Sequence, residues 1–221
     1  MCGRFTATFE FREIKVRWNL HEEPPNFSPR YNIAPSQDIP VIVRGESGNE
    51  LKVMRWGLIP SWAKDPAIGQ RMINARAETL SEKPAFKRLL GKRRCLVPAD
   101  GFYEWRREGK RKVPVWVYLE NKDPFGFAGL WDLWKRPEGE DLYSFTIITT
   151  AANERLRPIH DRMPVILEPG SGEKWLDPTY TSFSTLSVLL QPFPSVRMKA
   201  HDVSTLVNLP VNDTEECIQP A

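Results

Sequence analysis

The chain has few cysteines, few histidines and no long apolar run. Its three cysteines, Cys2, Cys95 and Cys217, are an odd number at wide spacing, which argues against a disulfide framework and for reduced thiols. The three histidines are scattered and no cysteine pair has zinc-ligand spacing, so we expect neither a metal nor a cofactor. No stretch of about 18 apolar residues exists, which excludes a helical membrane span.

Length and charge indicate one globular domain. At 221 residues the chain fits a single β-rich unit, residues 1–221, whose polar tail after about Asn208 we expect to be loose. Charges in Met1–Glu13 stand where a signal peptide needs apolar residues, so we expect an intracellular protein, cytoplasmic and nucleoid-associated if bacterial. The net charge of +3 permits a polyanionic partner without requiring one.

Hydrophobic periodicity predicts mostly strands with a few short helices. Phe11, Ile14 and Trp18 fall at helical spacing behind Thr8 as a possible N-cap. Residues 39–44 and 50–56 indicate a hairpin around a Gly-Glu-Ser-Gly-Asn turn. Further strands are expected at 95–99, 114–120, 126–133, 143–150, 164–167 and 196–203, and helices at 84–90, 152–156, 172–176 and 181–189.

Cys2 is the most informative single residue. A small second residue favours removal of Met1, which would leave Cys2 with an α-amine and a thiol on adjacent carbons. Such a 1,2-aminothiol condenses with an aldehyde to an imine and then closes a thiazolidine ring. An α-amine titrates near 7.7–8.0, so a useful fraction is nucleophilic at neutral pH. A cysteine behind a start codon is incidental in most chains, so the downstream residues decide.

Eight short segments carry more polar and aromatic detail than a core needs. They are Met1–Phe5, Tyr31–Pro35, Trp56–Pro60, Asn74–Glu78, Ala99–Trp105, Thr149–Asn153, Ile159–Pro164 and Val203–Asn208. No single motif is specific, but their ordered succession along almost the whole chain is. Together they resemble the SOS-response-associated peptidase family, the SRAP domains of abasic-site-processing proteins.

The resemblance implies both a fold and an activity. The fold would be a single α+β domain, with a mixed, mostly antiparallel, barrel-like β-sheet and short flanking helices. The activity would be covalent crosslinking of Cys2 to abasic sites in single-stranded DNA, which shields the lesion. The implied partner is abasic single-stranded DNA, including single-strand/double-strand junctions. We expect the protein to be a monomer that does not bind a membrane.

Four residues are expected to carry the chemistry: Cys2, Asn74, Glu104 and His160. Imine formation needs proton transfers, for which a carboxylate and an imidazole are suited. The aromatic neighbours of Glu104 favour a carboxyl group that exchanges a proton near neutrality, although a surface glutamate on a strand would have the same pattern. Asn74 could hold the amine or the sugar oxygen, or only satisfy a strand edge. His160 could act in acid–base chemistry or be a hydrogen-bonded structural histidine.

A second set is expected to bind DNA. Arg4, Arg76 and Arg162 each lie within two residues of Cys2, Asn74 or His160, so phosphate contacts there would hold the lesion at the nucleophile. Trp62 and Trp105 could stack on bases, or could be core residues. The basic runs 87–94 and 106–112 resemble a phosphate footprint, and a solvated turn explains the second run equally well.

Two other functions compete with crosslinking. A thiol peptidase, including self-removal of Met1, would use Cys2 as nucleophile and His160 as base, but the sequence reveals neither an oxyanion hole nor a substrate groove. A non-covalent single-strand-binding module would leave Cys2 incidental. A denaturing gel with an abasic oligonucleotide would separate all three.

Overall fold

A closed five-stranded β-barrel forms the centre of the molecule. The computed structural model describes residues 2–21, 27–136 and 139–221. The barrel closes through β10, β4, β3, β6 and β9 in that order, because β10 pairs with both β4 and β9. Of the five pairings that close the barrel, only β10–β4 is parallel, so the sheet is mixed and mostly antiparallel, as expected. These strands are β3 (Asp38–Arg44), β4 (Asn49–Trp56), β6 (Arg94–Ala99), β9 (Phe125–Trp134) and β10 (Leu142–Ala151).

Three short strands extend the barrel sheet at its edges. β5 runs beside β10 in parallel, β11 pairs with the end of β10, and β12 pairs with the start of β9. They are β5 (Asn74–Arg76), β11 (Arg162–Pro164) and β12 (Ile166–Leu167).

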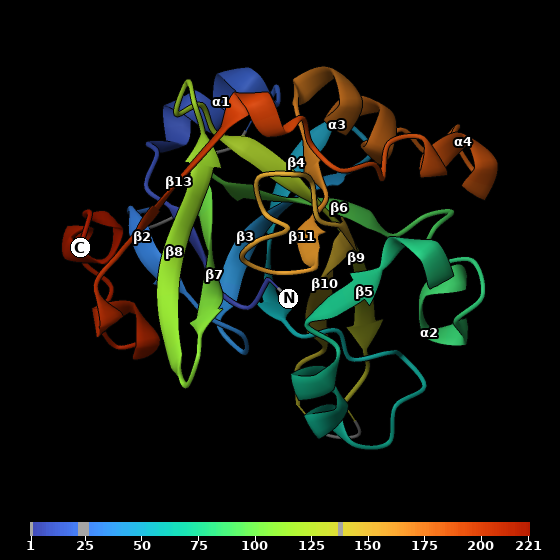
Figure 1. Ribbon diagram of the computed structural model, residues 1–221. Coiled ribbons are helices and arrows are strands. Elements are labelled where there is room, and N and C mark those ends of the chain that lie inside the picture. The colour runs from blue at the N-terminus through green and yellow to red at the C-terminus, as the bar shows by residue number, and fades with distance from the viewer. Residues whose placement is uncertain (1, 22–26, 137–138) are drawn as a thin grey trace.

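A second sheet of five strands packs against the barrel (Figure 1). Its order is β13, β8, β7, β1 and β2, and its strands are β1 (Phe5–Ala7), β2 (Arg30–Ile33), β7 (Gly101–Glu108), β8 (Arg111–Leu119) and β13 (Met198–Asp202). Phe5 of β1 packs against the barrel: the centre of its ring lies 5.2 Å from that of Trp56 and 5.7 Å from that of Phe127. Burying side chains of this size contributes roughly 1.5–3 kcal/mol each.

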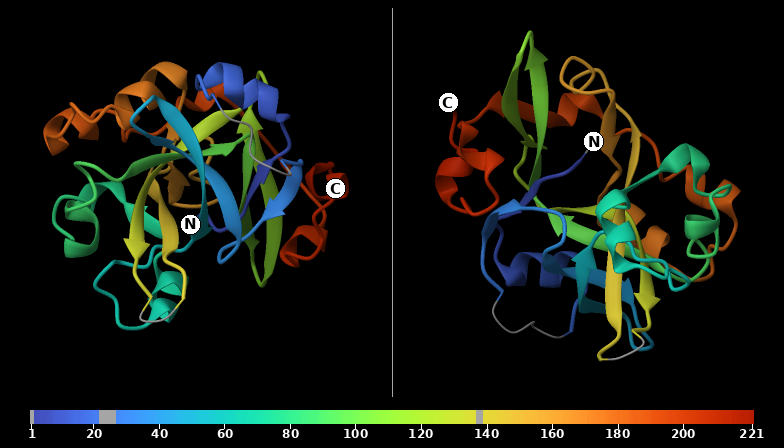
Figure 2. Two further views of the ribbon diagram at one scale, coloured as in Figure 1. Left: turned by 180° about the vertical axis from the view of Figure 1, so that it is seen from behind. Right: turned by 90° about the horizontal axis from the view of Figure 1, so that it is seen from below.

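Short helices lie around the two sheets (Figures 1 and 2). The α-helices are α1 (Phe11–Arg17), α2 (Pro84–Lys87), α3 (Pro169–Leu176) and α4 (Phe183–Ser187). The 3-10 helices are η1 (Pro66–Arg71), η2 (Ala77–Thr79), η3 (Ser195–Arg197), η4 (Thr205–Asn208) and η5 (Glu215–Ile218). No helix in the described residues is long and apolar enough to cross a membrane.

Two local predictions were wrong. The N-cap of α1 is Glu10, whose N–H donates to the Glu13 carboxylate at 2.8 Å; Thr8 instead donates its hydroxyl to Asp100. The buried Asp100 carboxylate therefore outcompetes the helix end for the Thr8 side chain. Residues 152–156 do not form a helix: residues 154–156 are turns, and the Asn153 amide before them donates to Phe193 O and Met198 Sδ.

The C-terminal tail also differs from the expectation of a loose segment after Asn208. Asp213 accepts backbone hydrogen bonds from Tyr31 at 2.5 Å and Asn32 at 2.8 Å. The tail buries Cys217 completely and forms an antiparallel bridge between Val203 and Pro220. The polar composition did not indicate this packing, because hydrogen bonds to β2 and a small apolar cluster hold the tail in place.

Candidate active site

Cys2 is fully buried beside strand β7. Phe5 and Thr6 of β1 pair with Phe102 and Gly101, and Tyr103 N donates to Arg4 O at 2.9 Å, so the N-terminal segment runs antiparallel along β7 toward Glu104. Gly101 permits this close approach, since a Cβ there would lie 2.9 Å from Thr6 Oγ1. The first described residues lie between the β7–β8 hairpin and the segment that joins β10 to β11 (Figures 1 and 2).

The surroundings of Cys2 keep its thiol protonated. Burial raises the pKa of the Cys2 thiol far above its ordinary value, and the negative charge of Glu104 raises it further. A thiol in this state is a poor first nucleophile, because the thiolate is the reactive form. The site therefore suits a reaction in which the thiol acts after another group has attacked.

Glu104 lies within β7 and is almost completely buried. Strand alternation places it on the same face as Phe102, which packs against Phe127 of the barrel. The sequence also allowed Glu104 to be an exposed glutamate on a strand, and its burial excludes that alternative. Its negative charge acts on the Cys2 thiol and raises the pKa of that group.

Asn74 is positioned by the barrel. Strand β5 pairs it with Ile147, and its amide Nδ2 donates to Ile73 O at 3.0 Å. Trp56 Nε1 donates to the same carbonyl at 3.0 Å, and the Trp56 ring contacts Phe5. Within the described residues, the buried Asn74 Oδ1 has no hydrogen-bond partner. An unsatisfied buried acceptor is rare in native proteins and makes Asn74 Oδ1 suited to a ligand N–H.

His160 lies in the segment between β10 and β11. Its Nδ1 accepts the backbone N–H of Arg162 at 3.0 Å and lies 2.8 Å from Asp161 Oδ1. These contacts require opposite states of Nδ1, because the first needs a lone pair and the second a proton. The two contacts hold the imidazole ring of His160 in a defined orientation.

Arg162 holds this segment in place. Its guanidinium forms a bidentate pair with Glu78, at 2.7 and 2.8 Å, and donates to Thr149 O at 2.7 Å. The Arg162 side chain is only 13% exposed, so the predicted phosphate contact would compete with these partners. Arg76, at the end of β5, is exposed and remains open to a phosphate.

Arg4 is likewise committed within the protein. Its Nη1 donates to Asn32 Oδ1 at 2.8 Å and to Val207 O at 2.6 Å, and its guanidinium lies 5.9 Å from the Trp105 ring centre. Trp105 Nε1 donates to Asn208 Oδ1 at 2.8 Å. Helix η4 thus fixes both a basic and an aromatic side chain next to the N-terminal segment.

The sequence did not single out Asn32, Trp56 or Asp213 as site residues. Asn32 is fully buried and ties Arg4 to the tail, since its Nδ2 donates to Asn212 O at 2.7 Å. Asn32 and Trp56 lie in two of the matching motifs, which was a usable signal. Asp213 lay in the supposedly loose tail and gave none.

Trp62 is separate from these contacts. It is 57% exposed on the loop after β4 and lines a cavity of about 310 Å³ with Lys64, Ile68 and Arg71. This exposure fits base stacking better than core packing, although no contact brings Trp62 to Cys2.

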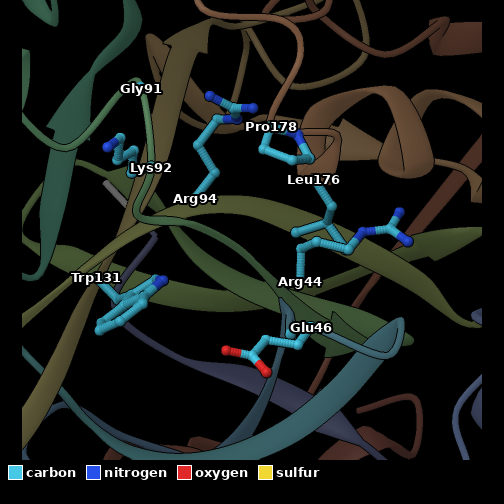
Figure 3. A pocket seen from close by; sticks show the side chains of 9 residues that line it. Arg44, Glu46, Gly91, Lys92, Arg94, Trp131, Leu176 and Pro178 are labelled. Carbon is cyan, nitrogen blue, oxygen red and sulfur yellow. The ribbon is translucent and has the colours of Figure 1, made fainter.

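The basic run 87–94 borders a different hollow (Figure 3). Lys92 and Arg94 line a cavity of about 290 Å³ together with Arg44 and Trp131, and no site residue named above takes part in it. In the part of the chain that the structure describes, no three His, Cys, Asp or Glu side chains gather to hold a metal ion.

The family model for SOS response associated peptidase (SRAP) matches residues 1–210, so the chain belongs to this family. Abasic site processing protein YoqW of Bacillus subtilis is 50% identical over 222 residues, covering 99% of each chain. Abasic site processing protein HMCES of Rattus norvegicus is 37% identical over 271 residues, covering 100% of this chain and 76% of that protein. A crystal structure of a Bacteroides thetaiotaomicron protein superposes with a TM-score of 0.91 at 30% identity and covers 100% of both chains. The expected family and fold are confirmed.

Proposed function

We propose that this chain captures abasic sites in single-stranded DNA by forming a thiazolidine through Cys2, and so shields the lesion. The observation that carries the proposal is the buried Cys2 thiol, whose pKa is raised by burial and by Glu104. A peptidase needs a thiolate at the outset, whereas a thiazolidine needs the thiol only for the second bond. The names of the relatives as abasic site processing proteins support the same substrate.

The first bond forms between the Cys2 amine and the sugar aldehyde. Removal of Met1, which lies outside the described residues, exposes that amine. The amine nitrogen attacks C1′ of the open-chain sugar, and the resulting carbinolamine loses water to give an imine. Glu104 takes a proton from the attacking nitrogen, and Asn74 Oδ1 accepts its remaining N–H and so orients the lone pair.

The second bond closes the ring. The Cys2 sulfur adds to the imine carbon, and the thiol proton passes to the nitrogen, so that aminothiol and aldehyde give thiazolidine plus one water. His160 assists the earlier opening of the sugar by protonating the ring oxygen, and the same group serves the reverse reaction. The contacts of His160 Nδ1 with Arg162 N–H and Asp161 orient the ring for this transfer.

Electrophoresis under denaturing conditions tests the proposal. The protein is mixed with a single strand that carries one abasic site, and with a matched strand that carries a tetrahydrofuran analogue without an aldehyde. A heat-stable band of protein plus DNA with the first strand only supports the crosslink. Retention of both strands in native gels without a covalent band would indicate a binding module, and cleavage of peptides without crosslinking would indicate a peptidase.

A further inference from the structure

The β7–β8 hairpin extends past the barrel as a regular arm (Figure 1). Its strands stay paired to the end, where Glu108 lies opposite Arg111. The turn consists of Gly109 and Lys110, and Gly109 adopts a φ of 59°, a left-handed value that glycine adopts without strain. Side chains on this arm therefore keep a fixed spacing from Glu104, which lies on the same strand.

The two faces of the arm differ in charge compensation. On the face of Glu104, Arg106 donates to Asp202 at 2.8 and 2.7 Å and to Glu108 at 3.0 and 2.8 Å, which neutralises it. On the face of Trp105, Arg107 lies directly opposite Lys112, and both are exposed. Like charges directly opposite each other on an antiparallel pair destabilise it.

The remaining two cations of the arm, Lys110 and Arg111, are exposed at the turn. None of the ion pairs formed between described residues involves Arg107, Lys110, Arg111 or Lys112, which we name the basic arm. The hydrogen bond from Trp105 Nε1 to Asn208 Oδ1 lies at the base of the basic arm, two residues before Arg107. The alternative interpretation of this basic run, a solvated turn, does not explain why four cations without ion-pair partners among the described residues gather next to the candidate site.

We propose that the basic arm binds backbone phosphates of the single-stranded DNA flanking the lesion. Arg107 lies two residues beyond Trp105, roughly 7 Å along the strand, and the turn lies about as far again beyond it. A strand whose damaged sugar lies at Cys2 therefore meets the arm within its first few flanking nucleotides, on the Trp105 face of the hairpin, which is opposite to that of Glu104. Phosphates there relieve the repulsion between Arg107 and Lys112. This inference rests on the proposed function, because the lesion fixes where the strand begins.

Salt-dependent binding of the tetrahydrofuran strand tests the arm without requiring crosslink formation. The double variant Arg107→Gln/Lys112→Gln should flatten the slope of log Kd against log salt by about 1.4, since each phosphate contact on a single strand contributes about 0.7. The control Arg12→Gln/Lys15→Gln removes two exposed cations from α1, at the opposite end of the molecule from the turn (Figure 1), and should keep the parent slope. The exchange Arg107→Lys/Lys112→Arg keeps the charge and should also keep the slope.

Trimming the DNA gives a second, independent reading. Shortening the strand to one nucleotide on the 5′ or the 3′ side should weaken binding of the parent on one side only, and the Gln/Gln variant should be insensitive to that trimming. The proposal that the basic arm binds phosphates would be contradicted if the Gln/Gln variant kept the parent slope, or if the α1 control flattened the slope equally. Absence of a covalent band with parent protein and a true abasic strand would instead overturn the proposed function, whatever the slopes.

Discussion

Glu78→Gln distinguishes two roles of Arg162 that make opposite predictions. In the structure Arg162 is held by Glu78 and Thr149 O, while its backbone N–H donates to His160 Nδ1. If Arg162 positions His160, loss of the Glu78 charge should loosen the segment and slow crosslinking. If Arg162 mainly contacts phosphate, the same change should release its guanidinium and strengthen DNA binding.

The expected cost in stability follows from the exposure of the pair. Glu78 is 50% exposed and Arg162 13%, so solvent screens the attraction and the bidentate pair contributes about 0.5–1 kcal/mol. For a chain of this length, a change of 1 kcal/mol lowers Tm by roughly 2–4 °C. Arg162→Ala also removes the hydrogen bond to Thr149 O, so about 1–2 kcal/mol is expected.

The pair between Glu168 and Arg197 supplies a matched control. It is also bidentate, at 2.8 and 2.6 Å, with both side chains about equally exposed, at 43% and 44%. Glu168→Gln should cost similar stability and leave the crosslinking rate unchanged. Single-turnover crosslinking and urea unfolding of both variants check this. Equal rates in Glu78→Gln and the parent, or tighter DNA binding by Glu78→Gln, would refute the positioning role.

The stability difference should also depend on pH. The hydrogen bond from Arg162 lowers the pKa of the Glu78 carboxyl in the folded protein. A lowered folded pKa adds stability above the ordinary carboxyl value of about 4.3, and this stability is lost as the pH falls through the folded value. The difference in unfolding free energy between parent and Glu78→Gln should therefore shrink below about pH 4.

Three further predictions concern the chemistry and the DNA. Cys2→Ala should abolish the heat-stable crosslink but keep binding, and borohydride should trap an imine on the alanine amine; a heat-stable band without reductant would remove the thiol from ring closure. Arg76→Ala should weaken binding of damaged and undamaged single strands alike and flatten the salt slope by about 0.7; an unchanged slope would exclude this contact. Glu104→Gln should slow crosslinking by about a hundredfold to ten-thousandfold, whereas His160→Ala should slow both formation and reversal; parent-like rates and pH profiles in both would show that neither moves a proton.

The strands and their order along the chain could be predicted because their signals are local. The hairpin of residues 39–44 and 50–56 appears as β3 and β4 with almost the expected bounds. Local patterns do not reveal closure of a barrel, which depends on β10 pairing with two distant strands. They also did not reveal the helix cap at Glu10, because the competing acceptor for Thr8, Asp100, is 92 residues away.

The sequence predicted which residues belong to the candidate site, but it did not predict the contacts that they make. Motif matching named Cys2, Asn74, Glu104 and His160, and the structure links Cys2 to Glu104 through electrostatics and Asn74 to Phe5 through Trp56. From the sequence, we predicted a phosphate contact for each of Arg4, Arg76 and Arg162. Two of them have partners far away in the chain: Arg4 binds Val207 O, 203 residues later, and Arg162 binds Glu78, 84 residues earlier. Such partners follow from the fold and leave no local pattern.

The intact mass of the covalent product tests the central claim most directly. We expect the mass of the chain without Met1 plus that of the abasic strand, less one water, because imine formation expels water and ring closure expels nothing. Protein that retains Met1 should remain uncrosslinked in the same sample. A crosslinked species that retains Met1, or a product mass without loss of water, would contradict attack by the Cys2 amine and with it the thiazolidine.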